Sequence, residues 1–127
     1  MKASAGRAAG RCILVVEDEY LLAKRIADEF ASLGVGTIGP ANTVQRALDL
    51  VEHGGHLDGA VLDIKVRGDM VFPVADALRA RGVPFVFATG YDQQAIPHRY
   101  SDVEHYQKPL DPAQIVRALF SKPAKIL

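Results

Sequence analysis

The chain has 127 residues, which is the size of one domain with one hydrophobic core. Its 15 basic and 15 acidic residues balance, so charge gives no reason to expect nucleic acid as a partner. No stretch approaches the roughly 20 apolar residues that span a bilayer, and the N-terminus lacks the apolar segment of a secretory signal. We therefore expect a cytoplasmic protein that contacts no membrane.

Strand and helix patterns alternate from the start of the chain. Residues 12–17 form a β-branched run that predicts a strand, and residues 19–33 predict an amphipathic helix that ends at Gly34. Residues 35–38 predict a second strand, which we expect to end at Gly39-Pro40.

The next two units repeat this alternation. Asn42 and Gln45 resemble a capping pair at the start of a second helix, whose apolar stripe is Val44, Ala47, Leu48 and Val51 and which ends at Gly54-Gly55. Residues 57–63 predict a strand and residues 64–72 a loop. Pro73 suits the first turn of a third helix, which ends at Gly82.

The last part of the chain predicts two strands and one clear helix. Residues 84–88 are apolar throughout, as expected for a strand covered on both faces, and residues 103–107 form another strand. Asp111 is the expected cap of a helix that starts at Pro112. Residues 90–102 carry glycine, proline and many polar side chains, so we expect one helical turn there at most.

Polar side chains close four of the predicted strands, namely Glu17, Asp18, Asp63, Thr89 and Lys108. Alternating strands and helices predict a parallel sheet with helices on both faces. Ligands of such sheets lie beyond the carboxyl ends of the strands. We therefore expect these side chains to gather at one edge of the sheet.

The chemistry that such a group favours is phosphoryl transfer. Carboxylate oxygens are hard ligands that suit Mg²⁺ or Mn²⁺, and a dication relieves the repulsion among packed carboxylates. Asp63 is the candidate nucleophile and would form an aspartyl phosphate. Lys108 can neutralise the transferring oxygens, Thr89 can donate its hydroxyl to one of them, and Gly90 leaves space and offers its amide.

These residues form an ordered set that resembles the receiver domain of two-component response regulators. The set consists of Ile13-Leu-Val-Val-Glu17-Asp18, Val61-Leu-Asp63-Ile, Phe87-Ala-Thr89-Gly and Gln107-Lys108-Pro109. The resemblance covers residues 11–121, with flexible tails at residues 1–10 and 122–127. It implies an α/β, flavodoxin-like (CheY-like) fold, which is a doubly wound parallel sheet of five strands in the order 2-1-3-4-5.

The resemblance also implies the roles of the site residues. Asp63 would take a phosphoryl group from a phosphohistidine of a sensor histidine kinase or a phosphotransfer protein. Glu17, Asp18 and Asp63 would hold Mg²⁺ together with the backbone carbonyl of Lys65. Lys108 would pair with the phosphoryl group, and the Lys108–Pro109 bond would be cis. Such domains catalyse only their own phosphorylation and dephosphorylation, so we expect no other enzymatic activity.

A narrower resemblance is to single-domain receivers with a Phe-Ala-Thr-Gly-Tyr motif, here Phe87 to Tyr91. These proteins are often served by kinases of the HWE or HisKA2 type, and their fourth helix is reduced or replaced by a loop. We therefore expect signalling by protein contact or phosphorelay to an unidentified downstream protein. Lys65 and Tyr91 would tune hydrolysis of the acyl phosphate. We expect Tyr91 to slow attack by water, and an unchanged phosphate lifetime in Tyr91→Ala would contradict this.

Three features depart from the common receiver pattern. His105 stands where most receivers have Tyr or Phe three residues before the lysine, and it could act as the switch residue or as an exposed edge residue. Ser101-Asp102 replaces a frequent Gly-Ala step. A shortened fourth helix leaves open whether the usual dimer through that face forms.

Simpler interpretations exist for single residues. An acidic pair can mark the start of a helix, Thr89 can be a turn hydroxyl, and Lys108 can be a surface ammonium. Cys12, the only cysteine, is expected to be a buried reduced thiol. The remaining histidines, His53, His56 and His98, lack the spacing of metal ligands.

Two other functions are compatible with parts of the pattern. A Mg²⁺-dependent phosphohydrolase with an aspartyl phosphate usually carries its nucleophile on the first strand, with a second aspartate two residues later. Here Glu17 and Asp18 are adjacent, and no cap domain is evident. A pseudo-receiver that binds partners without phosphate conflicts with the complete set of acids, threonine and lysine.

Overall fold

The computed structural model describes residues 9–90 and 96–120, so most of both expected tails lies outside the described residues. Its centre is a five-stranded parallel sheet in the order β2-β1-β3-β6-β7. The strands are β1 (Cys12–Val16), β2 (Gly36–Ala41), β3 (Gly59–Asp63), β6 (Phe85–Thr89) and β7 (His105–Gln107). The predicted strand order 2-1-3-4-5 is therefore confirmed.

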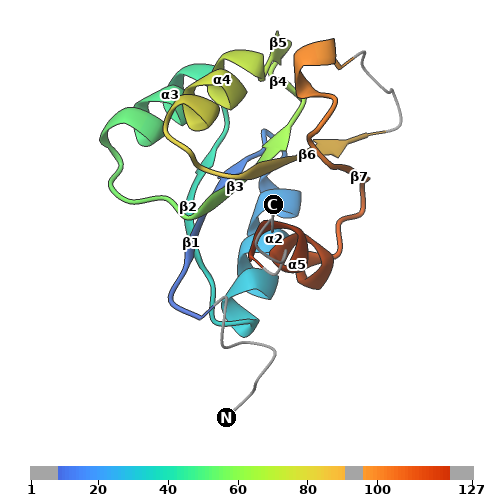
Figure 1. The fold of residues 1–127 in the computed structure, drawn as a ribbon. Helices are drawn as coiled ribbons and strands as arrows, with labels where there is room; N and C mark the ends of the chain where they lie inside the picture. Colours follow the sequence, from blue (N-terminus) through green and yellow to red (C-terminus); the bar gives the residue numbers. More distant parts are fainter. Residues whose placement is uncertain (1–8, 91–95, 121–127) are drawn as a thin grey trace, which may run out of the picture.

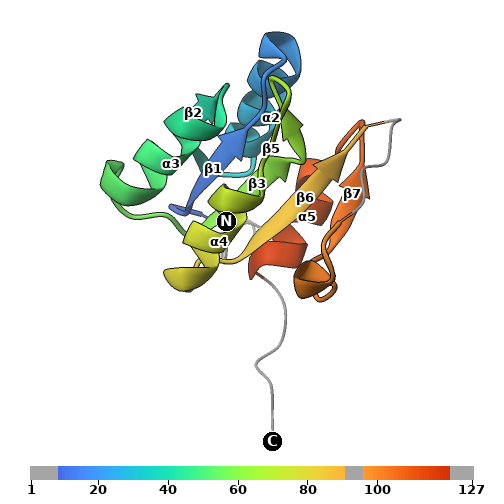
Figure 2. The same ribbon diagram turned by 90° about the horizontal axis from the view of Figure 1, so that it is seen from above.

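Helices cover both faces of the sheet, as the alternation of elements predicted. Helices α3 and α4 lie on one face, and helices α2 and α5 lie on the other (Figure 1 and, turned by 90°, Figure 2). Their bounds are α2 (Tyr20–Ser32), α3 (Val44–His53), α4 (Phe72–Ala80) and α5 (Pro112–Phe120). In the described ranges, every helix is too short or too polar to cross a lipid bilayer.

The sheet separates two apolar cores, and the alternation of side chains along β1 shows how. Leu14 and Val16 point into the core beneath α3 and α4, while Ile13 and Val15 point into the core beneath α2 and α5. All four side chains are buried. A strand that is covered on both faces must be apolar at every position, which is why this segment lacks a polar alternation.

Two predictions about the second strand and the second helix were wrong in detail. β2 continues through Gly39-Pro40 to Ala41, because Ala41 pairs with Val16 of β1 after a register shift between Leu14 and Val16. The cap of α3 is Thr43 rather than Asn42. The Thr43 hydroxyl accepts a hydrogen bond from the Arg46 amide at 3.0 Å.

The segment that follows β3 was predicted as a loop and is instead a small hairpin. β4 (Lys65–Val66) pairs with β5 (Asp69–Met70) in antiparallel orientation. Strands of two residues are too short to leave a hydrophobic period in the sequence, so the pattern gave no signal for them.

The connection between β6 and β7 contains a single 3₁₀ turn in its described part, η1 (His98–Tyr100). Residues 91–95 lie outside the described residues, and Tyr91 is among them. The expectation that a loop with one turn replaces the fourth helix is confirmed for the residues that the structure describes.

Tyr100 anchors this connection to α4. Its ring is 1% exposed and lies stacked on Phe72, with ring centroids 5.3 Å apart. Its hydroxyl contacts the Asp76 carboxylate and lies 3.1 Å from the Phe72 carbonyl oxygen. Two ion pairs flank the ring, Arg99 with Asp76 at 3.2 Å and Arg79 with Asp102 at 3.0 Å.

We expect Tyr100→Phe to lower the free energy of unfolding by about 1–2 kcal/mol, because it removes a buried hydroxyl that has hydrogen-bond partners on α4. Urea unfolding would measure the difference. Tyr20→Phe is the matched control, since Tyr20 is 71% exposed and its change should stay within about 0.5 kcal/mol. Equal losses in the two variants would show that the hydroxyl anchors nothing.

At the side of the sheet where the parallel strands begin, Arg11 contacts both α5 and the residue before β3. Its guanidinium lies 5.1 Å from the centre of the Phe120 ring, at the end of α5. The same guanidinium is 3.7 Å from the Asp58 carboxylate, whose other oxygen accepts a hydrogen bond from the Cys12 amide. The first strand and the last helix are thus joined at this edge.

Candidate functional site

The polar residues that end β1, β3 and β7 meet at the carboxyl edge of the sheet. Val16 pairs with Leu62, so Glu17 and Asp63 follow side by side on adjacent parallel strands. One carboxylate oxygen from each of Glu17, Asp18 and Asp63 lies within 4.8 Å of the other two. The predicted acidic cluster is therefore present, although its members come from distant parts of the chain.

Lys108, the residue that directly follows β7, places its ammonium group in this cluster. Its ammonium donates a hydrogen bond of 2.6 Å to Glu17 Oε1 and one of 3.1 Å to Asp63 Oδ2. The Lys108–Pro109 peptide bond is cis, as the resemblance implied. The ammonium thus bridges the two strands that carry the buried carboxylates.

Burial dominates the electrostatics of these groups. Burial, together with repulsion from Asp63, raises the pKa of Glu17 to about 7 in spite of the attraction of Lys108. Burial likewise raises the pKa of Asp63, with the Asp18 charge acting in the same direction. Burial alone would lower the pKa of Lys108, but its hydrogen bond to Glu17 and the charges of Asp63 and Glu17 outweigh that effect and raise it.

The donor set fits a hard divalent cation. Glu17 is buried, Asp63 is half-buried and Asp18 is exposed, so the cluster opens to solvent at Asp18. Burial raises the pKa of Glu17 and of Asp63, and repulsion from a neighbouring carboxylate acts in the same direction on each of them. A cation bound by carboxylate oxygens would supply the missing positive charge.

Backbone amides donate hydrogen bonds to two of the carboxylates, and neither bond was predicted from the sequence. Glu17 Oε2 accepts from the Glu19 amide at 3.0 Å, and Asp18 Oδ2 accepts from the Arg67 amide at 2.9 Å. Arg67 lies in the hairpin that was predicted as a loop. Its neighbour Gly68 marks a tight turn and was the available signal.

The structure places the remaining predicted residues around the cluster or beyond the described part. Thr89 is buried, and its hydroxyl donates to the Tyr106 carbonyl at 3.4 Å. Among the described residues, no atom lies within 4 Å of the Cβ position that a side chain at Gly90 would have. Lys65 is exposed in β4 and His105 is exposed in β7. Tyr91 lies outside the described residues.

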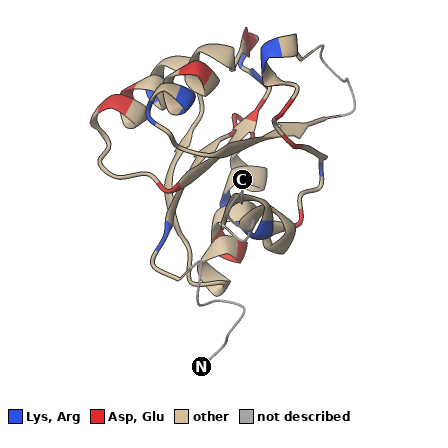
Figure 3. Cartoon of the chain, in the orientation of Figure 1, with Lys and Arg blue, Asp and Glu red and all other residues tan. Residues whose placement is uncertain are grey.

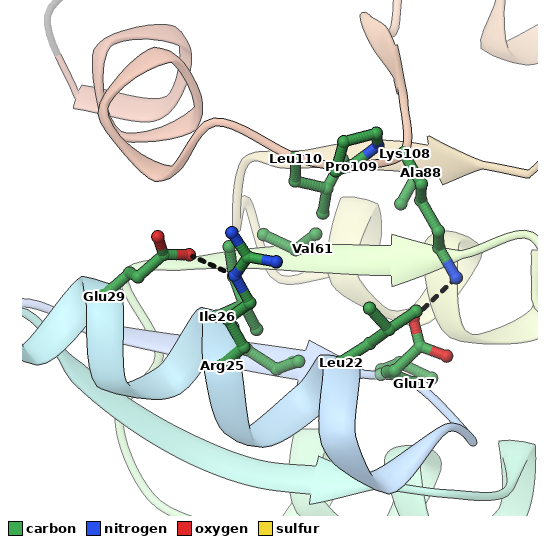
Figure 4. A pocket seen from close by; sticks show the side chains of 12 residues that line it. Glu17, Leu22, Arg25, Ile26, Glu29, Val61, Ala88, Lys108, Pro109 and Leu110 are labelled. Atoms are coloured by element: carbon green, nitrogen blue, oxygen red, sulfur yellow. Dashed lines mark hydrogen bonds and ion pairs between the residues drawn. The ribbon is translucent and has the colours of Figure 1, made fainter.

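A small apolar cavity of about 50 Å³ lies beside the cluster, between α2 and the segment after β7 (Figure 4). The Glu17–Lys108 pair closes one end, and the Arg25–Glu29 pair lies at the other. Apolar side chains form the walls, among them Leu22, Ile26, Val61, Ala88, Pro109 and Leu110. Apolar walls on this side of Lys108 lower the local dielectric and strengthen its attraction to the carboxylates.

The raised pKa of Glu17 predicts how stability depends on pH in metal-free protein. A carboxyl whose folded pKa lies above its unfolded value stabilises the fold below about pH 4.5, and this contribution is lost as the pH rises through about 7. We therefore expect the free energy of unfolding of the parent to fall between pH 5 and pH 8 by on the order of 1–2 kcal/mol more than that of Glu17→Gln, after allowance for solvent screening.

Urea unfolding in the presence of a chelator at both pH values would measure this difference. Glu52→Gln is the matched control, because the Glu52 side chain is 53% exposed on α3. Parallel pH profiles for the parent and Glu17→Gln would contradict the prediction.

Comparison with known proteins finds solved structures that have a similar fold. No protein-family model matches the chain, and no curated protein sequence matches it. The solution structure of SdrG from Sphingomonas melonis Fr1 is similar, with 39% identity over 88% of this chain and 97% of that chain and a TM-score of 0.76. The beryllofluoride-activated conformation of SdrG from Pseudomonas melonis Fr1 has 42% identity, covers 88% and 95% of the two chains, and has a TM-score of 0.70.

A more distant structure shares the fold alone. It is a response regulator receiver protein from Sinorhizobium medicae WSM419, with 21% identity over 86% of this chain and 90% of that chain and a TM-score of 0.70.

Proposed function

The chain belongs to the receiver domains of response regulators, and from this premise we propose that Asp63 accepts a phosphoryl group from a histidine kinase or a phosphotransfer protein. The observation that carries the proposal is the position of the Asp63 carboxylate. It lies 3.1 Å from the Lys108 ammonium and within 4.8 Å of the Glu17 and Asp18 carboxylates. The activated state of the similar SdrG structure, formed with beryllofluoride, supports it further.

The chemical step is an in-line displacement at phosphorus. An Asp63 carboxylate oxygen attacks the phosphorus of the donor phosphohistidine and forms the new oxygen–phosphorus bond. The phosphorus–nitrogen bond breaks, and its electron pair returns to the imidazole nitrogen of the donor. The product on this chain is an aspartyl phosphate. Hydrolysis reverses the modification when water attacks the same phosphorus and restores the carboxylate.

The residues around Asp63 neutralise and orient the transferring group. Lys108 stays protonated beside the carboxylates and offers its charge to the phosphoryl oxygens. Thr89 offers its hydroxyl, and the open space at Gly90 admits an oxygen near its amide. Glu17, Asp18 and Asp63, with the backbone carbonyl of Lys65, would hold Mg²⁺, which when bound supplies positive charge to the phosphoryl oxygens.

The phosphorylated state would signal through protein contacts or a phosphorelay. A phosphoryl dianion beside Thr89 would attract the Thr89 hydroxyl away from the Tyr106 carbonyl. The loss of this hydrogen bond would alter the contact between β6 and β7. His105, exposed on β7, lies next to this contact and is a candidate switch residue. Lys65 and Tyr91 are proposed to tune the lifetime of the phosphate.

The finer parts of the proposal concern partners and activity. We propose a kinase of the HWE or HisKA2 type as donor, since residues 87–91 follow the motif of receivers served by such kinases. We also propose that the protein acts in the cytoplasm and catalyses only its own phosphorylation and dephosphorylation. A phosphotransfer panel with purified histidine kinases of the source organism would identify the donor.

The direct test uses the purified chain with acetyl phosphate and Mg²⁺. We expect intact-mass spectrometry to show the addition of one phosphoryl group, labile to hydroxylamine, and beryllofluoride with Mg²⁺ to shift amide resonances around Asp63 and Thr89. A protein unaffected by both reagents would be a pseudo-receiver instead. Steady turnover of a generic phosphate ester would favour the phosphohydrolase alternative.

A further inference from the structure

The hairpin after β3 has an unusual turn residue. The pairs Lys65 with Met70 and Val66 with Asp69 leave Arg67 and Gly68 as the two residues of the turn. Both have positive φ, 50° for Arg67 and 85° for Gly68, as a type I′ turn requires. Arg67 is the one residue other than glycine with positive φ among the described residues. Asparagine is the more usual residue at such a position, because its side chain tolerates the left-handed conformation.

In this conformation the backbone amide of Arg67 points toward the acidic cluster. The Arg67 amide donates a hydrogen bond of 2.9 Å to Asp18 Oδ2, across 49 positions of sequence. Glu17 and Asp63 are held by the Lys108 ammonium. Asp18 is the exposed member of the cluster, and within the described ranges Arg67 provides the hydrogen bond that reaches its carboxylate.

We propose that Arg67 is a positioning residue for the metal site, because its left-handed backbone holds the amide that orients Asp18. The inference rests on the proposed function, since it takes Glu17, Asp18 and Asp63 as the metal ligands. The amide hydrogen bond to Oδ2 restrains the orientation of the Asp18 carboxylate, one oxygen of which lies within 4.8 Å of carboxylate oxygens of Glu17 and Asp63. Hydrogen bonds from outside the ligand set commonly fix ligand orientation in this way and raise metal affinity.

The test compares substitutions that change the backbone preference at one position. Arg67→Val keeps the amide but disfavours positive φ, whereas Arg67→Gly and Arg67→Asn tolerate it. Glycine and valine both remove the guanidinium, so the difference between them isolates the backbone. We expect calorimetric titration with Mg²⁺ alone to show affinity about ten-fold weaker in Arg67→Val and within about two-fold of the parent in Arg67→Gly and Arg67→Asn.

A second readout follows the hydrogen bond without metal. We expect the amide resonance of residue 67 to lie downfield in the parent and in Arg67→Gly, and to move upfield in Arg67→Val and in Asp18→Ala. Gly55→Val is the matched control, because Gly55 has φ of 92° and open space but lies before β3, at the other edge of the sheet. It should lose stability and keep its Mg²⁺ affinity.

The outcomes separate this inference from the proposed function. If Arg67→Val binds Mg²⁺ like the parent, or if Gly55→Val is weakened equally, the positioning role is wrong while phosphorylation of Asp63 stands. If the parent binds no Mg²⁺ and takes no phosphoryl group, both the proposed function and this inference are overturned.

Discussion

Asp63→Asn is expected to abolish phosphorylation, with a rate of labelling at least about 10³-fold below that of the parent, because an amide lacks the nucleophilic carboxylate oxygen. The variant should remain folded. Burial and the Asp18 charge raise the pKa of Asp63, so a neutral side chain at this position avoids the cost of a buried charge and should raise the free energy of unfolding in metal-free protein. Radiolabelled phosphotransfer from a kinase or acetyl phosphate, together with urea unfolding, measures both effects.

Asp28→Asn is the matched control for this experiment. The Asp28 side chain is 69% exposed on α2, where it pairs with Lys24. It should be labelled at the parent rate and should change stability little. Labelling of Asp63→Asn at the rate of the parent would place the phosphate on another residue and refute the proposed function.

Lys108→Met is expected to slow phosphoryl transfer by about 10²–10³-fold, because the transferring oxygens lose a fixed positive charge in a partly dry site. The substitution keeps most of the side-chain volume and removes the bonds to Glu17 and Asp63. The pKa of each carboxyl should then rise further. A raised carboxyl pKa favours the folded state at low pH, so Lys108→Met should lose more stability at pH 8 than at pH 5.

Lys24→Met provides the matched control, since the Lys24 side chain is 56% exposed and pairs with Asp28 on the surface of α2. Single-turnover phosphotransfer at saturating donor separates the chemical step from docking. Unchanged rates in Lys108→Met would mean that the ammonium has only a structural role, which its stability profile would then reveal.

Much of the fold and the site was predictable because the relevant signals are local. The apolar run at residues 12–16 marks a strand, and Pro112 at the first position of α5 marks the start of a helix. Parallel strands end at a common edge, so the positions of Glu17, Asp63 and Lys108 at strand ends predict that their side chains meet. As predicted, the Lys108 ammonium lies 2.6 Å from Glu17 Oε1 and 3.1 Å from Asp63 Oδ2.

The features that were missed depend on long-range contacts or very short elements. β2 extends past Gly39-Pro40 because β1 supplies a partner there, which local turn propensity does not contain. The hairpin at residues 65–70 has only two pairs of residues. It contacts the acidic cluster through the hydrogen bond from the Arg67 amide to Asp18. Such a backbone contact leaves no side-chain pattern in a sequence.

The contact between Arg11 and Phe120 has a practical consequence for handling the protein. It brings Arg11 and Phe120, which lie near the two ends of the described residues, to the side of the sheet where the strands begin, while Asp63 lies where β3 ends. An affinity tag, a fluorescent fusion or a surface linker attached near Arg11 or Phe120 would therefore be joined to the protein at the side of the sheet opposite Asp63. Immobilised protein should leave that pocket accessible to a docking kinase, whichever end carries the attachment.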